Sequence, residues 1–336
     1  MNVIGAMNTQ LAPFSALTPD IILNALDALG LPCDGRMLAL NSYENRVYQV
    51  GIAGSPTLVV KFYRPGRWTD EAILEEHAFV QELSEAELPV VPALAFAGGK
   101  TLHHIEGFRF TVFPKQGGRV PELEGRIKLE WMGRLLGRIH ATGALWPFKN
   151  RPALDISSFG EEPRSYLLAN NCLPGEFVNA YQEASGQALD SVRECFVRAG
   201  QVRQIRLHGD CYPGNILWTD DGPHFVDFDD SRSGPAVQDL WMLLSGGREE
   251  MTVQLRHLLA GYQTFFDFDH RELHLIEALR TLRLIHYSAW IAKRWDDPAF
   301  PAAFPWFTMP RYWQDRIVEL REQIALMAEP PLGVSL

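Results

Sequence analysis

The spacing of apolar residues changes near residue 114, and this change most constrains the fold. Residues 36–41, 45–52 and 57–63 are short runs rich in Leu, Val, Tyr and Phe, and turn-forming residues separate them. Such runs predict an antiparallel meander. Two more strands are predicted over 101–105 and 108–113. Beyond residue 121 the apolar residues recur with helical spacing, so the sequence predicts an α+β fold with a small strand-rich N-terminal lobe and a larger, mainly helical C-terminal lobe.

A stretch rich in proline and glycine, 114–121, predicts the boundary between an N-lobe, 1–115, and a C-lobe, 116–336. Residues 1–15 read as a loose end, after which Thr18-Pro19-Asp20 opens a helix that Gly30 ends. Ile127, Trp131, Leu135 and Ile139 form the apolar stripe of a predicted helix over 124–141. The other helices are predicted over 69–84, 174–198, 236–245, 249–266, 271–294 and 311–328.

Charge and cysteine content exclude several classes of protein. The chain of 336 residues has 31 Lys and Arg against 41 Asp and Glu, a net charge of −10, which argues against nucleic acid or an anionic membrane as partner. Its four cysteines form no CxxC pair, so we expect neither a zinc site nor disulfides. The first basic residue is Arg36, and no apolar run approaches the roughly 18 residues of a membrane span, so we expect a cytoplasmic protein.

The segment from Leu207 to Asp230 is the most informative about function. Asp210 follows a short strand in the sequence His-Gly-Asp, and Asn215 comes five residues later. A three-residue turn at 220–222 would place Asn215 directly opposite Asp227 in an antiparallel hairpin. The loop that begins at His208 would then bring Asp210 to the same end of the hairpin.

Two carboxylates and one amide oxygen in this position suit Mg²⁺, which takes its remaining ligands from water and phosphate. Asp210, if it is not itself the main metal ligand, is placed to accept a proton from an incoming hydroxyl. The catalytic loop of protein kinases has the same interval of five between Asp and Asn, and Asp227-Phe228 stands where their metal-binding Asp stands. Each motif alone is commonly a turn, but the combination predicts phosphoryl transfer from ATP.

A lysine inside an apolar strand, Lys61, is the second candidate feature. A buried ammonium needs a partner, and the next predicted helix offers Glu76 on its packed side. Glu75 stays open as the alternative, because the helix register cannot be set to one residue. Such a Lys–Glu pair would hold the lysine against the phosphates of ATP, although an edge-strand lysine that reaches solvent has the same sequence pattern.

The turn from Asn41 to Asn45 falls where a phosphate-covering loop would lie. It contains no glycine, but Ser42 and the backbone amides could donate to phosphate oxygens. Asp239, in the first turn of the predicted helix over 236–245, either complements the helix dipole or bonds the backbone amides beside Asp210.

Taken together, these residues resemble the aminoglycoside phosphotransferase and choline kinase group, which has the bilobal protein-kinase-like fold. The matching residues are Lys61, Glu76, His208-Gly209-Asp210, Asn215 and Asp227. Further segments, among them Ser42-Tyr43-Glu44-Asn45 and Asp297-Pro298-Ala299-Phe300-Pro301, are similar to a bacterial serine/threonine protein kinase of this group that acts in stress response.

The resemblance implies ATP as co-substrate, with Ser42 near its phosphates, and Mg²⁺ as cofactor. It further implies Asp210 as the proton acceptor and Asn215 and Asp227 as the ligands of Mg²⁺. It also implies a cytoplasmic monomer that phosphorylates Ser and Thr of proteins and takes part in stress response. Gly209 stands where the usual catalytic loop has an arginine, so control by phosphorylation of an activation loop is not expected.

Three other functions stay open from the sequence. A kinase for a small hydroxyl compound such as choline, a sugar or an aminoglycoside would need acidic groups for a cationic acceptor, and segments 150–200 and 271–306 contain Asp155, Glu161, Glu162, Asp296 and Asp297. An idle nucleotide-binding regulator is the second. A dinuclear metal hydrolase with His208, Asp210, Asp227 and Asp229 is the third, although further histidines for it are missing.

Overall fold

The computed structural model describes residues 12–333, which divide into two compact units. The first unit contains the described residues up to Thr69, together with Leu94–Lys115 and Arg294–Phe304. The second contains Asp70–Ala93, Gln116–Lys293 and the described residues from Pro305 onward. The chain passes between the units at several points, of which 115/116 is one. As a boundary between folding domains, 115/116 stays a prediction.

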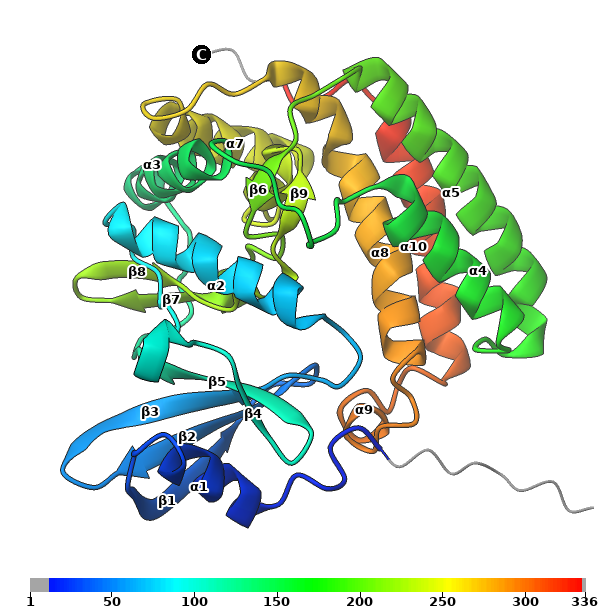
Figure 1. The fold of residues 1–336 in the computed structure, drawn as a ribbon. Coiled ribbons are helices and arrows are strands. Elements are labelled where there is room, and N and C mark those ends of the chain that lie inside the picture. Colours follow the sequence, from blue (N-terminus) through cyan, green and yellow to red (C-terminus); the bar gives the residue numbers. More distant parts are fainter. Residues whose placement is uncertain (1–11, 334–336) are drawn as a thin grey trace, which may run out of the picture. The chain divides into compact units, whose positions relative to one another are not determined.

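The first unit is built on a five-stranded antiparallel sheet with strand order β1-β2-β3-β5-β4 (Figure 1). Its strands are β1 (Cys33–Leu40), β2 (Arg46–Ile52), β3 (Ser55–Phe62), β4 (His103–Ile105) and β5 (Phe108–Pro114). The predicted meander and the two later strands are therefore confirmed. Its helices are α1 (Pro19–Asp27), α9 (Ala299–Ala303) and the short 3₁₀ turn η1 (Ala97–Gly99).

Helix α1 packs on this sheet and closes its core. Thr18 Oγ1 accepts a hydrogen bond from the amide of Ile21 at 3.4 Å, and Pro19 occupies the first helical position, as the sequence predicted. The core joins three residues of the helix to seven of the strands: Ile22, Ala25, Leu26, Val50, Ile52, Val60, Phe62, Phe108, Phe110 and Val112. Most of the predicted loose end, residues 1–11, lies outside the described residues.

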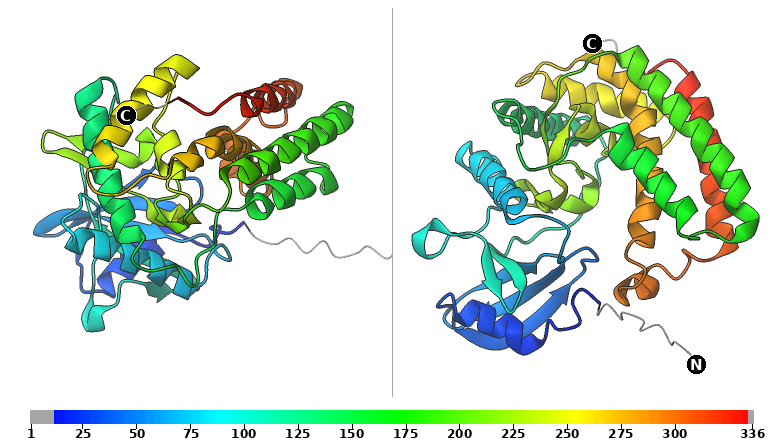
Figure 2. Two further views of the ribbon diagram at one scale, coloured as in Figure 1. Left: turned by 90° about the horizontal axis from the view of Figure 1, so that it is seen from above. Right: turned by 45° about the vertical axis from the view of Figure 1, so that its right-hand side comes forward.

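The second unit is mainly helical. Its α-helices are α2 (Asp70–Glu85), α3 (Arg126–Gly143), α4 (Glu162–Ala169), α5 (Val178–Ala199), α6 (Val237–Trp241), α7 (Arg248–Tyr262), α8 (Ile276–Ala292) and α10 (Pro310–Ala328). Two short ladders complete it, β6 (Ile205–Leu207) with β9 (Arg232–Gly234), and β7 (Ile216–Thr219) with β8 (Gly222–Phe225). Helices α4, α5, α8 and α10 lie side by side in both figures (Figures 1 and 2).

The helical predictions hold with three differences. Helix α4, with the π-helical turn Ser157–Glu161 before it, and the short α9 were not predicted. The helix predicted over 236–245 is only the five residues of α6. The segment predicted as the start of α8 is instead a 3₁₀ helix, η6 (His270–Leu275). Elements of only one or two turns carry too little periodicity for the sequence to reveal them.

The predicted stripe of helix α3 is wrong at its first residue, because Ile127 is 78% exposed. The buried face keeps Leu135 and Ile139 of the predicted stripe, and it also contains Leu129, Met132, Leu136, His140 and three glycines. A Cβ built on Gly133 would lie 2.0 Å from the carbonyl oxygen of Leu258, in α7. Helices α3 and α7 thus cross with their backbones in contact, and glycine rather than a large apolar residue determines which face is buried.

Replacing Gly133 with alanine should therefore destabilise the protein by about 3 kcal/mol, although alanine favours a helix more than glycine does. The methyl group would meet the α7 backbone, which cannot move as a flexible side chain can. Gly186→Ala in α5 is the matched control, because its Cβ would be 3.4 Å from the flexible end of Arg164. Urea unfolding should show the loss for Gly133→Ala only. Equal stability of the two variants would contradict this account of the α3–α7 contact.

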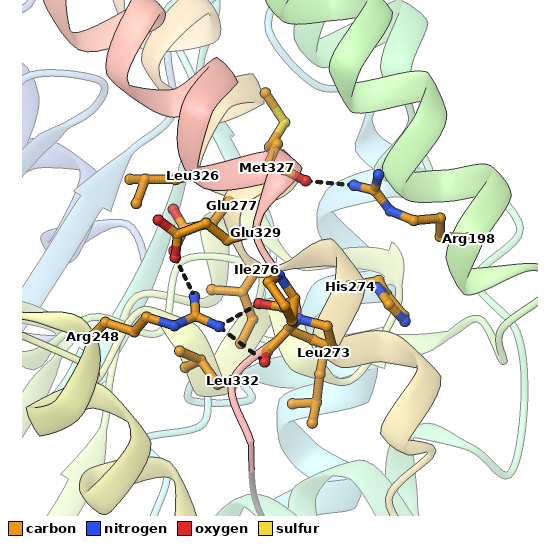
Figure 3. A pocket seen from close by; sticks show the side chains of 12 residues that line it. Arg198, Arg248, Leu273, His274, Ile276, Glu277, Leu326, Met327, Glu329 and Leu332 are labelled. Carbon is orange, nitrogen blue, oxygen red and sulfur yellow. Dashed lines mark hydrogen bonds and ion pairs between the residues drawn. The ribbon is translucent and has the colours of Figure 1, made fainter.

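Two arginines bind the end of α10 and the segment that follows it (Figure 3). Arg248 donates to the carbonyl oxygens of Pro330 and Pro331 and pairs with Glu329 at 3.3 Å. Arg198 donates to the carbonyl oxygen of Met327 at 2.6 Å. The small pocket between these groups contains none of the predicted site residues. Among residues 12–333, no helix combines the length and apolar character that crossing a bilayer requires.

Candidate active site

The register of the β7–β8 hairpin differs by one residue from the prediction. Thr219 pairs with Gly222, so the turn contains two residues rather than three. The hydroxyl of Thr219 accepts from the amide of Asp221 at 3.2 Å and donates to the carbonyl of Gly222 at 3.1 Å, which closes the tighter turn. As a result Asn215 faces Val226, whose amide donates to its carbonyl at 3.0 Å, and Asp227 comes one residue later.

Asp227 nevertheless stays at the open end of the hairpin. Its backbone is left-handed, with φ 60° and ψ 63°, so the chain leaves the strand direction at this residue and enters a 3₁₀ turn over Phe228–Asp230. Asp and Asn tolerate this conformation better than most residues. The side chain is exposed. A carboxylate that ends a strand in this way can reach a ligand that the strand itself does not touch.

Asp210 and Asn215 are in direct contact. The side-chain amide nitrogen of Asn215 donates to the carbonyl oxygen of Asp210 at 2.9 Å and to its Oδ2 at 3.2 Å. These bonds use the nitrogen and leave the amide oxygen of Asn215 as the atom that can bind a cation. Burial raises the pKa of Tyr212, and the negative charges of Asp210 and Asp227 raise it further. Both carboxylates therefore affect the pKa of the same side chain, Tyr212, which lies in the loop between Asp210 and Asn215.

Asp239 holds the backbone of the loop before Asp210. Its two carboxylate oxygens accept the amides of His208 and Gly209, each at 2.9 Å. His140 Nε2 donates to the same carboxylate at 3.1 Å. Burial alone would raise the pKa of Asp239, but the hydrogen bond and charge of His140 and the loop amides lower it below its usual value. Of the two interpretations of Asp239, the contact with the loop amides is therefore confirmed.

Helix α6, which carries Asp239, is itself held by a buried glutamate. Glu272 Oε2 accepts the amide of Val237 at 2.8 Å, and the side chain is 2% exposed. Burial raises the pKa of Glu272 from 4.5 to about 7. The folded protein therefore binds a proton here that the unfolded chain has already released at neutral pH.

This raised pKa makes the free energy of unfolding fall as pH rises from about 4.5 to 7, by about 3 kcal/mol. Glu272→Gln resembles the protonated form and should remove that fall, so the variant should exceed the wild type in stability increasingly from pH 5 to pH 8. Urea unfolding at several pH values measures the difference. Glu249→Gln, an exposed site in α7, is the control. A constant difference between Glu272→Gln and the wild type would refute the prediction.

The two candidate glutamates of α2, Glu75 and Glu76, have separate contacts in the second unit. Glu75 accepts the backbone amides of residues 149, 150 and 151, at 2.6, 2.8 and 3.0 Å, so its carboxylate holds that loop. Glu76 is 3% exposed and its Oε2 lies 3.6 Å from Nη1 of Arg151. Arg151 also donates to the carbonyl oxygens of Asp229 and Ser231. Glu76 is thus joined through one buried arginine to the segment that follows Asp227.

In the first unit, the loop that contains Ser42 is fixed by charged groups. Glu44 pairs with Arg64 at 3.0 Å and with Arg294 at 2.7 Å, and Asp297 pairs with Arg64 at 2.8 Å. Burial alone would raise the pKa of Asp297, but the hydrogen bond from Arg64 and the nearby charges lower it. The segment around Asp297 belongs to this unit although it follows α8 in the chain, and it supports the loop at 41–45.

Lys61 lies near the end of β3 and is 6% exposed. Its Nζ lies 5.2 Å from the centre of the Tyr63 ring, within the range of a cation–π contact. The alternative prediction for Lys61, an edge-strand lysine that reaches solvent, is therefore wrong. β3 is a central strand of the sheet, and the side chain of Lys61 is buried. Pairing of Lys61 with Glu76 stays a prediction.

Sequence reasoning missed three residues that organise the site. His140 bonds Asp239, Arg151 joins Glu76 to the 229–231 segment, and Arg283 of α8 donates to Asp210 Oδ1 at 2.6 Å. The sequence marks them only as basic residues, His140 and Arg283 in predicted helices and Arg151 in a connecting loop, which many structural residues share. No three His, Cys, Asp or Glu of residues 12–333 form a group that would hold a metal. A dinuclear hydrolase centre therefore has no ligand set among these residues.

Comparison with known proteins identifies the family. The phosphotransferase enzyme family matches residues 37–276. Stress response kinase A of Escherichia coli strain K12 is 44% identical over 329 residues, which are 98% of this chain and 99% of that protein. The same identity and coverage hold for a protein of Salmonella typhimurium strain LT2 named serine/threonine protein kinase RdoA.

Solved structures show the same fold. Amicoumacin kinase in complex with AMP-PNP, Ca²⁺ and its ligand has a TM-score of 0.72 at 19% identity, over 95% of this chain and 96% of that one. A microcompartment-associated aminopropanol kinase has a TM-score of 0.68 at 17% identity, over 92% and 96% of the two chains. The predicted α+β, protein-kinase-like class is thereby confirmed. The chain is a kinase that belongs to the phosphotransferase enzyme family, in the group that includes Stress response kinase A.

Proposed function

We propose that the protein is an ATP- and Mg²⁺-dependent kinase that phosphorylates serine and threonine hydroxyls of other proteins and acts in stress response. The names of relatives at 44% identity support the acceptor class and the physiological role. The arrangement of Asp210, Asn215 and Asp227 supports the chemistry. One observation carries the proposal: the side-chain nitrogen of Asn215 donates to Asp210 Oδ2 at 3.2 Å, so the two polar residues of the predicted catalytic loop are in contact.

The oxygen atoms in this arrangement fit a magnesium ion. The amide oxygen of Asn215 and the carboxylate of Asp227 are hard donors, and the exposure of Asp227 leaves room for a ligand. Magnesium, when bound, would neutralise charge on the β- and γ-phosphates and orient them. Since the described residues contain no closed metal cage, the ion would take further oxygens from the nucleotide and water.

The chain's own residues would divide the work as follows. Asp210 would accept the proton of the acceptor hydroxyl, while Asn215 keeps that carboxylate oriented through its amide nitrogen. Lys61, which we expect to pair with Glu76, would bind the phosphates, and Ser42 with the amides of its loop would donate to them. Asp239 would keep the backbone at His208 and Gly209 in place during the reaction.

Most of the acidic residues that a cationic small acceptor would need are already used within the fold. Glu161 pairs with Arg193 at 2.6 Å, Asp297 pairs with Arg64 at 2.8 Å, and Asp155 caps the turn that follows it. These are three of the five carboxylates that favoured such an acceptor. Their structural contacts argue against a cationic acceptor.

The proposal is tested by offering the purified protein labelled ATP and Mg²⁺ with two pools from one lysate, one of proteins and one of metabolites below 3 kDa, a size cut of roughly 25 residues. Label should enter the protein pool as phosphoserine and phosphothreonine, and EDTA should abolish it. Asp227→Asn serves as the inactive control. Label that enters only the metabolite pool would identify a small-molecule kinase instead, and ATP binding without transfer to either pool would identify an idle regulator.

A further inference from the structure

The predicted catalytic loop lacks a cation of its own. Residues 208–215 contain no lysine or arginine. Phosphoryl transfer brings the negative charge of the transferring group close to the carboxylate that acts as base, and enzymes offset such charge with fixed positive groups. A lysine or arginine side chain near Asp210, in addition to a bound metal, therefore has to come from another part of the chain.

Arg283 of α8 provides that group. Its Nη1 donates to Asp210 Oδ1 at 2.6 Å, although the two residues are 73 positions apart. A charge-assisted bond of this length is among the stronger hydrogen bonds in proteins. The same guanidinium lowers the pKa of Tyr212, which burial and the charges of Asp210 and Asp227 raise. Arg283 therefore lies close enough to Tyr212 for its charge to oppose the effect of Asp210 and Asp227 on that side chain.

The contacts of Asp210 define its orientation from two sides. Oδ1 accepts from Arg283, and Oδ2 accepts from the amide nitrogen of Asn215 at 3.2 Å. Bonds to both oxygens fix rotation about the last bond of the side chain, yet each oxygen keeps a further lone pair for an acceptor hydroxyl. Asn215 alone would hold only Oδ2 of Asp210. The bond from Arg283 to Oδ1 is therefore needed to prevent rotation of the carboxylate.

Accessibility distinguishes Arg283 from a purely structural arginine. Its side chain is 40% exposed and that of Asp210 is 22% exposed, so the pair is open to an approaching ligand. By contrast Arg151, whose side chain is fully buried, uses its nitrogens on several backbone carbonyls. Among residues 12–333, Asp210 is the hydrogen-bonding partner of Arg283. This bond uses one of the five N–H donors of the guanidinium group.

We propose that Arg283 is a positioning residue of the phosphoryl-transfer reaction, which holds the Asp210 carboxylate in the orientation that accepts the proton of the acceptor hydroxyl. This inference rests on the proposed role of Asp210. It gives a residue of α8, Arg283, a role in catalysis, although α8 lies outside the loop and hairpin that contain Asp210, Asn215 and Asp227. Since a small displacement of a reacting group can lower a rate by about 100-fold, loss of this bond should be visible mainly in kcat.

The first test replaces Arg283 with glutamine and measures phosphoryl transfer. We expect kcat to fall by about 100-fold with little change in KM for ATP, because Asp210 remains but is no longer held. Arg283→Lys, which can still donate one charged bond to Oδ1, should restore about 10-fold of that loss. Arg280→Gln is the matched control: it lies one turn earlier on α8, pairs with Glu277 at 3.2 Å, and should retain full activity.

A second measurement separates action through Asp210 from a general effect on the fold. In an Asp210→Asn background, Arg283→Gln should cause no further loss of single-turnover transfer, because the carboxylate that the arginine positions is already gone. An additional 100-fold loss in the double variant would overturn the inference, as would full activity of Arg283→Gln. Retained binding of a labelled ATP analogue with Mg²⁺ shows that each variant is folded.

The two proposals can fail separately. If Asp210→Asn keeps wild-type activity, the proposed role of Asp210 is wrong, and the inference about Arg283 falls with it. If Asp210→Asn is inactive while Arg283→Gln is as active as the wild type, only the inference about Arg283 is wrong.

Discussion

Asp227→Asn is expected to lower the rate of phosphoryl transfer by about 1,000-fold, since a bound metal contributes several kcal/mol to stabilising the transition state. The exchange removes the negative charge but keeps a residue that accepts the left-handed backbone at this position, where φ is 60°. Alanine would add backbone strain to the loss of the ligand, so asparagine tests the metal role more cleanly. The fold should be unchanged because Asp227 is exposed.

The measurement is initial rate against Mg²⁺ concentration at saturating ATP. The variant should need more magnesium for half-maximal rate, as well as reaching a lower maximum, because one anionic ligand is lost. Asp221→Asn, an equal charge change in the exposed turn of the same hairpin, is the matched control and should behave as the wild type. A wild-type rate and magnesium requirement for Asp227→Asn would exclude this residue as the metal ligand.

Asp210→Asn is the second large effect that we expect, with kcat lowered by about 100-fold to 10,000-fold, the range that a general base contributes. Asparagine keeps the size of the side chain and one oxygen for Arg283, but it cannot take up the proton of the acceptor hydroxyl. Binding of ATP with Mg²⁺ should persist, since the nitrogen of Asn215 retains the backbone oxygen of residue 210 as a partner at 2.9 Å.

This difference between binding and turnover is the decisive readout for Asp210. Asp227→Asn should impair magnesium dependence and rate together, whereas Asp210→Asn should impair the rate alone. Pre-steady-state transfer to the acceptor and equilibrium binding of an ATP analogue measure the two quantities separately. Transfer at the wild-type rate by Asp210→Asn would show that the proton leaves by another route.

The placement of Asp210, Asn215 and Asp227 at one end of the hairpin could be predicted because these residues are close in sequence. Asp210 and Asn215 belong to one loop, and a short hairpin returns the chain to Asp227. The exact register could not be predicted, since the hydroxyl of Thr219 closes a two-residue turn where the sequence also allows three. Asn215 and Asp227 remain at the same end, because a shift of one position moves a residue by only a few ångströms.

The choice between Glu75 and Glu76 could not be made from periodicity, because adjacent residues flank the same face of a helix. In the folded chain three backbone amides at 149–151 occupy Glu75, and this loop lies more than 70 positions further along the chain. Glu76 turns to Arg151 instead. The error at Ile127 has a related cause: glycines bury the opposite face of α3 by close backbone contact, which a hydrophobic pattern does not register.

The sequence by itself determined the strand-rich and helical parts of this protein and the oxygen-bearing side chains of its site. Both depend on short-range spacing, which the order of residues expresses directly. Only the tertiary structure decided which distant groups hold those side chains: Arg283 for Asp210, His140 for Asp239 and Arg151 for Glu76. These partners are separated by about 70 to 100 positions, and such contacts depend on how the helices pack, which no local pattern of residues encodes.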